Sequence, residues 1–114
     1  MIRLVAGLIV MSGALVFASA ASAQHEDVIE RGKKVYAAQK CQICHSIEGK
    51  GNKNGPLDGV GSKLSVDEIR QWIVDAPAMT AKAKAARKPL MKAYPNIVRD
   101  DLDALVTYLY SLKK

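Results

Sequence analysis

The sequence predicts an all-α domain, and three observations support this fold class. Apolar residues recur at three- and four-residue steps in residues 27–39, 65–76 and 99–112, as expected of amphipathic helices. No alternating apolar and polar run is long enough to indicate a strand. The 114 residues contain no internal repeat and no long linker, so the chain is expected to form one domain.

The first 23 residues have the pattern of a secretory signal peptide. A basic residue precedes an apolar run, and small residues end the run at an A-x-A type cleavage site, Ala21-Ser22-Ala23. We expect residues 1–23 to be removed and residues 24–114 to form the mature domain. The alternative is an uncleaved anchor, because the segment is about long enough to span a bilayer. Both readings place the folded part outside the cytoplasm, and we expect a periplasmic location.

The first predicted helix, residues 27–39, has a glycine near its centre. Val28, Gly32, Val35 and Tyr36 lie on one face at helical spacing. A glycine in a helix interior costs up to about 1 kcal/mol relative to alanine. A close approach of another backbone would explain why a glycine is used there.

The other two helices have clear signals at their ends. The second begins at Ser65, which forms a capping box with Glu68, and Pro77 ends it. The third has acidic residues in its first turn and two lysines after its end, both of which favour the helix dipole. Residues 49–61 and 77–96 are predicted to be loops, although residues 80–87 could form a helical turn or two. The apolar faces carry Ile69, Trp72 and Ile73 on the second helix, and Leu102, Leu105, Val106, Leu109 and Leu112 on the third.

The composition indicates a domain that depends on a cofactor. Domains of this size usually rely on disulfides, a metal or a cofactor to supplement a small core. Cys41 and Cys44 are the only cysteines, which excludes a disulfide framework, and the chain has only one Trp, four Tyr and one Phe. A large apolar cofactor would fill this deficit.

The segment Cys41-Gln42-Ile43-Cys44-His45 has the C-x-x-C-H spacing that attaches c-type haem. Two residues between the thiols separate them suitably for the two vinyl groups on one edge of a porphyrin. His45 follows Cys41 by one helical turn, so its imidazole can bind the iron. The motif therefore predicts a haem held by thioether bonds from Cys41 and Cys44, with His45 as an iron ligand.

Three other chemistries use similar residues. A thioredoxin-like redox motif needs βαβ units, which this sequence does not predict. Structural zinc usually has four Cys or His ligands, and besides Cys41, Cys44 and His45 the chain offers only His25, near the expected mature N-terminus. The third alternative is an accidental match in which the two cysteines form a plain disulfide.

Beyond this motif, the chain resembles the class I monohaem cytochromes c over residues 28–112. That family places a glycine and an aromatic residue on its N-terminal helix, matched by Gly32 and Tyr36, and packs them against an aromatic residue of the C-terminal helix, matched by Tyr108. The resemblance implies the cytochrome c fold. This fold has three main helices, with the N- and C-terminal helices crossing, wrapped around one covalently bound haem c.

The resemblance also implies roles for Pro56 and Trp72. Residues 55–61, Gly-Pro-Leu-Asp-Gly-Val-Gly, are similar to a family stretch that has one residue more. In the family the proline carbonyl accepts a hydrogen bond from the ligating imidazole, which here implies Pro56 and His45. Family tryptophans near the second helix can hydrogen-bond a haem propionate, which implies the same for Trp72. An apolar wall of the haem pocket is the alternative role of Trp72.

A second iron ligand is implied by residues 91–97, Met-Lys-Ala-Tyr-Pro-Asn-Ile, which resemble the family's methionine segment before the last helix. Lys92 replaces the usual proline of that segment, and Val98 occupies the position of the usual Ser or Thr cap. Met91 is therefore expected to bind the iron, with Met79 as the alternative ligand. The other reading of Met91 is an adaptable core residue, which is a common role of methionine.

An iron bound by both His45 and Met91 has no open position, which favours a carrier of single electrons over an enzyme. We expect an exported carrier that shuttles electrons between redox proteins. One alternative is the haem c subunit of a periplasmic oxidoreductase complex. The other is a haem-based peroxidase or gas-binding protein with an open iron site, for which the sequence offers no clear distal His or Arg.

The chain has a formal net charge of +6. An exported protein seldom meets nucleic acid, so we expect the basic surface to face redox partners with acidic docking surfaces. Lysines near the haem motif and near Met91 would orient such a partner. A merely solvated lysine surface is the alternative. Membrane contact is expected only through a partner or through an uncleaved N-terminal anchor.

Overall fold

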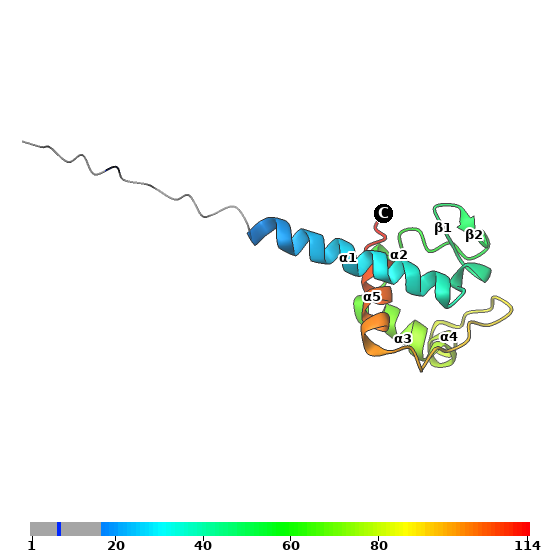
Figure 1. The fold of residues 1–114 in the computed structure, drawn as a ribbon. Coiled ribbons are helices and arrows are strands. Elements are labelled where there is room, and N and C mark those ends of the chain that lie inside the picture. Colours follow the sequence, from blue (N-terminus) through cyan, green and yellow to red (C-terminus); the bar gives the residue numbers. More distant parts are fainter. Residues whose placement is uncertain (1–6, 8–16) are drawn as a thin grey trace, which may run out of the picture.

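A computed structural model gives the fold of the chain and describes Gly7 and residues 17–114 (Figure 1). In Figure 1, α1 and α5 cross, and the other helices and the hairpin lie around this crossing. The predicted all-α class is confirmed. The helices are α1 (Phe17–Ala38), α2 (Val60–Lys63), α3 (Val66–Val74), α4 (Ala76–Ala83) and α5 (Arg99–Tyr110), with a 3-10 turn, η1 (Cys41–Ile43), and two strands, β1 (Ser46–Ile47) and β2 (Lys50–Gly51).

The crossing of α1 and α5 depends on Gly32. A side chain at this position would collide with the carbonyl oxygen of Ala104 and with the Cβ of Tyr108. One turn further along α1, Tyr36 meets Tyr108 edge to face, with ring centroids 6.2 Å apart and planes at 85°. The packing of Gly32 and Tyr36 against Tyr108 is therefore confirmed, and the mid-helix glycine is explained.

The hydrophobic core lies between α1, α3 and α5. Leu105 and Val106, both 1% exposed, are its largest fully buried side chains. An ion pair of 2.7 Å between Arg70 and Asp103 joins α3 to α5 at the edge of the core. The core cluster consists of Val35, Ile47, Ile69, Ile73, Leu105, Val106, Tyr108 and Leu109.

The first helix begins earlier than the apolar spacing predicted, at Phe17 rather than at residue 27. Alanine recurs between residues 18 and 23, and its high helix propensity allows the helix to extend. The expected cleavage site after Ala23 falls inside α1, most of the predicted signal peptide lies outside the described residues, and its removal stays a prediction. No helix within residues 17–114 is long and apolar enough to cross a membrane.

The prediction that Pro77 ends a helix and begins a loop is wrong. The second predicted helix ends at Val74, and Pro77 lies in the first turn of α4. Proline is tolerated there because the first amide groups of a helix have no partner within the helix. The capping box of Ser65 and Glu68 is confirmed, with both of its hydrogen bonds at 3.1 Å. The last helix ends at Tyr110 rather than at residue 112.

The short hairpin of β1 and β2 was not predicted. Glu48 and Gly49 both have positive φ, at 52° and 77°, as in the two-residue turns that suit hairpins. Each strand has only two residues, so no alternating pattern marks it in the sequence. The hairpin follows His45 directly and returns the chain to it, because the amide of Asn52 donates to the carbonyl of His45 at 2.9 Å.

Gly32→Ala tests the helix crossing. On an isolated helix the change would be stabilising by about 1 kcal/mol, because alanine is the better helix former. Here the added methyl group meets the backbone of α5, so we expect the free energy of unfolding to fall by about 1–3 kcal/mol. Urea denaturation measures this difference. An increase in stability would contradict a close contact of α1 and α5 at Gly32.

Candidate haem-binding site

The C-x-x-C-H motif forms a tight turn immediately after α1. Lys40 adopts a left-handed conformation, with φ 58° and ψ 36°, which turns the chain out of the helix. The amide groups of Cys44 and His45 then donate to the carbonyl of Cys41 at 3.2 and 2.9 Å. This single turn brings the two thiols and the imidazole to the wall of one cavity.

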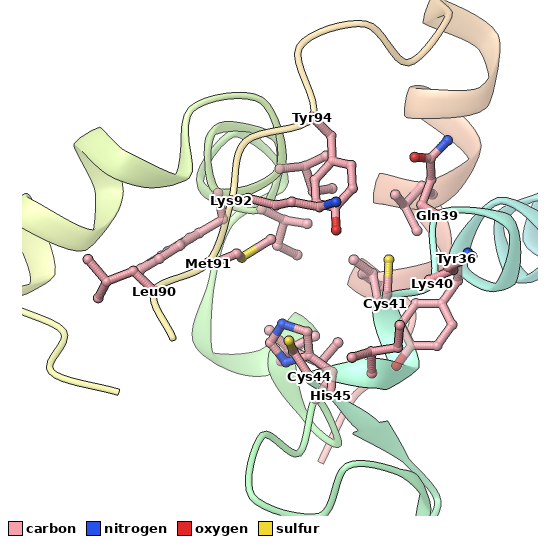
Figure 2. Close-up of a pocket in the computed structure, with 18 of the residues that line it drawn as sticks. Tyr36, Gln39, Lys40, Cys41, Cys44, His45, Leu90, Met91, Lys92 and Tyr94 are labelled. Atoms are coloured by element: carbon pink, nitrogen blue, oxygen red, sulfur yellow. The ribbon is translucent and has the colours of Figure 1, made fainter. Parts of the chain in front are cut away.

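The cavity has a volume of about 590 Å³ and a largely apolar wall. Figure 2 shows Met91, Cys41, Cys44 and His45 around the same space, although they come from two distant segments of the chain. The apolar part of the wall includes Leu57, Val60, Leu64, Ile69, Trp72, Ile73, Ile97, Leu105 and Leu109. Of the predicted site residues, the structure therefore brings all but Pro56 to this cavity.

The hydrogen bond predicted between Pro56 and His45 is wrong. His45 Nδ1 lies 3.0 Å from the carbonyl oxygen of Gly55, one residue earlier, and the amide of Ser46 donates to the same oxygen at 3.1 Å. The physical reason is the register between the two segments. Ser46 pairs with Pro56 in a parallel bridge, and the amide of Leu57 donates to the carbonyl of Ser46 at 2.8 Å. This pairing directs the preceding carbonyl, that of Gly55, toward the imidazole.

The bond to Gly55 determines which nitrogen of His45 can bind a metal. A carbonyl oxygen only accepts hydrogen bonds, so Nδ1 must carry the proton and Nε2 keeps its lone pair. Burial lowers the pKa of His45, and the nearby charge of Arg87 acts in the same direction, against the opposing effect of the Gly55 hydrogen bond. The lowered pKa favours the neutral imidazole, which is the form that metal coordination requires.

The Cys41 thiol does not resemble the activated cysteines of redox enzymes. Both cysteines are free, and burial raises the pKa of Cys41 to about 11. Thioredoxin-like cysteines have a lowered pKa instead, because the thiolate is their reactive form. Within residues 17–114 no group of three or more His, Cys, Asp or Glu side chains could hold a metal ion, so this part of the chain offers zinc no full ligand set.

The two candidate methionines occupy different environments. Met91 lines the cavity, and the segment that carries it is tied to the end of α3 by the amide of Tyr94, which donates to the carbonyl of Ile73 at 2.8 Å. Met79 is 6% exposed within α4 and does not line the cavity. The geometry thus favours Met91 over Met79, and its role as an iron ligand stays a prediction.

Trp72 and Tyr36 are aromatic residues of the cavity wall whose side chains also carry a polar group. Trp72 is half-buried on α3, and its indole N–H makes no hydrogen bond to any residue that the structure describes, so its bond to a propionate stays a prediction. The hydroxyl of Tyr36 is buried and has no partner among the same residues. Burial also raises the pKa of Tyr36 to about 12, so this hydroxyl stays protonated.

Sequence reasoning missed two residues of the site, Gly55 and Arg87. A side chain at Gly55 would collide with Nη1 of Arg87 and with the carbonyl oxygen of Cys44. Arg87 also lines the cavity. In the sequence, Arg87 lies in a segment of alanines and lysines that has no functional pattern. Near Gly55 the only departure from the family pattern is that the stretch 55–61 is one residue shorter.

Comparison with known proteins agrees with this geometry. A family model for cytochrome c matches residues 29–113, and the chain belongs to the cytochrome c family, as a class I c-type cytochrome. The chain is also similar to cytochrome c oxidase subunit 2 of Alkalihalophilus pseudofirmus, with 27% identity over 97 residues, which cover 77% of this chain. It spans only 27% of the length of that curated relative. No solved structure matches the chain.

Membership of this family implies covalently bound haem c and haem-based electron transfer with redox protein partners. The residues present fit such a group. Two free thiols and a neutral imidazole lie on the wall of one cavity, and the remaining wall is largely apolar. The family finding and the donor set therefore agree on the same site.

Substitutions at Gly55 and Pro56 test how strongly the imidazole depends on the Gly55 backbone. Gly55→Ala places a methyl group against the backbone of Cys44, so we expect it to destabilise the haem-loaded protein by about 1–3 kcal/mol and to alter its visible spectrum. Pro56→Ala, the control, leaves the Gly55 carbonyl in place and should cost at most about 1 kcal/mol. Denaturation and absorbance spectra measure both. An equal spectral change in Pro56→Ala would contradict a specific dependence of the imidazole on the Gly55 backbone.

Proposed function

We propose that this chain is an exported single-electron carrier that uses one haem c, with His45 and Met91 as the iron ligands. The observation that carries the proposal is that Cys41, Cys44, His45 and Met91 surround one largely apolar cavity. In this proposal the two thiols hold the group through thioether bonds, so it does not dissociate.

A haem held in this way supplies one-electron oxidation and reduction of its iron. His45 contributes a neutral imidazole whose orientation is maintained by Gly55. Met91 contributes a soft, uncharged thioether, which favours the ferrous state and raises the reduction potential. The apolar wall acts in the same direction, because it disfavours the additional charge of the ferric state. With two protein ligands no substrate reaches the metal, which supports a carrier rather than an enzyme.

The proposed location is the periplasm, after removal of residues 1–23. The A-x-A site ending at Ala23 supports this, and so does the C-x-x-C-H motif, because bacterial apocytochromes c are matured outside the cytoplasm. Under this proposal residues 24–114 are the mature domain.

The proposed partners are redox proteins with acidic docking surfaces. Lys40 and Lys92 line the cavity, and two exposed apolar residues, Ile43 at 64% and Leu90 at 47%, line it with them. No Asp or Glu of residues 17–114 lines the cavity. A cationic and apolar surface beside the haem supports rapid encounter with an anionic partner, followed by easy dissociation.

A second candidate function is that of a fixed subunit in a larger oxidoreductase complex. The similarity to a protein named cytochrome c oxidase subunit 2 favours this candidate, because the matching region is only part of that longer protein. Isolation of the native protein from membranes and periplasm distinguishes the two functions. A carrier is recovered as a small species of its own, whereas a subunit is recovered with its partners.

The third function, a peroxidase or gas-binding protein with an open iron site, requires Met91 to be absent from the iron. We expect the oxidised protein to have a weak absorbance band at the red end of the spectrum, from methionine sulfur bound to ferric iron. Met91→Ala should remove this band and lower the reduction potential, whereas Met79→Ala, the matched control, should keep both. A high-spin ferric spectrum in the unaltered protein would refute the carrier proposal.

The charge of the proposed docking surface is tested with small redox reagents. Oxidation of the reduced protein by ferricyanide, an anion, should slow by roughly tenfold or more from low to high ionic strength, because salt screens the attraction. Oxidation by a cationic cobalt complex should accelerate. Lys40→Gln and Lys92→Gln should weaken both trends. Stopped-flow absorbance measures the rates, and a flat salt response with both reagents would rule out electrostatic steering.

A further inference from the structure

Arg87 belongs to the exposed segment between α4 and α5, yet its guanidinium reaches the cavity. The added Cβ of a residue at position 55 would overlap Nη1 of Arg87, so the guanidinium lies directly against the Gly55 backbone. Within residues 17–114, Arg87 forms no ion pair, and no Asp or Glu lines the cavity. Its positive charge is therefore not neutralised by a neighbouring carboxylate in that part of the chain.

The contact with Gly55 connects Arg87 to the imidazole. The carbonyl oxygen of Gly55 accepts both the Nδ1–H of His45 and the amide of Ser46. A guanidinium is charged at every pH at which proteins are folded, and its planar shape allows it to pack against a peptide group. A permanent cation thus lies against the residue whose carbonyl orients the imidazole.

We propose that Arg87 is a positioning residue that raises the reduction potential of the site from the His45 side. This inference rests on the proposed function. Reduction adds one negative charge to the site, so a fixed cation nearby favours the reduced form. Packing against Gly55 also limits movement of the peptide that holds His45. Because the segment is exposed, solvent screens part of the charge, and the effect is smaller than that of a buried cation.

The other cations of the cavity wall occupy different places. Lys92 is next to Met91 in the chain, and its Nζ lies 5.1 Å from the centroid of the Tyr94 ring. Lys40 directly precedes the haem motif, two residues after the end of α1. Among the described residues that line the cavity, Arg87 is the only cation that also packs against Gly55. A substitution at Arg87 thus tests the charge on the His45 side of the cavity and leaves the lysines of the proposed docking surface in place.

Three variants of the haem-loaded protein test the proposal. Arg87→Gln removes the charge, Arg87→Lys keeps a charge but loses the planar group, and Arg99→Gln removes the charge of an arginine that does not line the cavity. Spectroelectrochemical titration measures the midpoint potential of each. We expect a lower potential in Arg87→Gln, with a several-fold smaller ratio of reduced to oxidised protein at a fixed applied potential. Arg87→Lys should retain most of the original potential, and Arg99→Gln should match the unaltered protein.

Two results would overturn the proposal. One is an unchanged potential in Arg87→Gln. The other is an equal decrease in Arg87→Gln and Arg87→Lys, because the charge would then have no separate effect. Failure of the proposed function has a different signature, namely no haem-sized increase in protein mass, or a high-spin ferric spectrum in the unaltered protein. The methionine band should persist in all three variants, which confirms that any change of potential arises with both iron ligands in place.

Discussion

The close contact of α1 with α5 at Gly32 is the constraint on which the rest of the structure depends. The haem motif follows the end of α1 directly, and the Met91 segment leads into the start of α5. The angle and register of the two helices therefore determine how the two ends of the site face each other across the cavity. Gly32 does not line the cavity, yet it controls the site because it controls this crossing.

Gly55 has a similar role at shorter range. Its carbonyl receives two hydrogen bonds, from His45 and from Ser46, and its missing side chain makes room for Arg87 and for the backbone of Cys44. One small residue thus orients the imidazole, fixes its protonated nitrogen and admits a cation beside it. The electronic properties of the site depend on backbone geometry as much as on the side chains of the motif.

The sequence predicted local features well, because their causes lie within a few residues. The turn from Cys41 to His45 follows from the motif spacing, and the cap of Ser65 follows from the position of Glu68. The crossing of the N- and C-terminal helices could be predicted only from the resemblance to a family. Features that depend on chain register or on distant contacts were missed. The acceptor of the His45 hydrogen bond is Gly55 rather than Pro56, and Arg87 reaches the cavity only through the path of an irregular segment.

The cavity wall and the hydrophobic core share side chains. Ile69, Ile73, Leu105 and Leu109 are buried members of the core cluster and also line the cavity. A substitution at any of these four positions therefore affects both the folding stability and the environment of the cofactor. A substitution that reshapes the pocket there also alters the packing of α3 against α5, so evolution has few independent ways to adjust one property without the other. Wall residues outside that cluster, such as Arg87 and Met91 in the irregular segment before α5, can change without altering this packing.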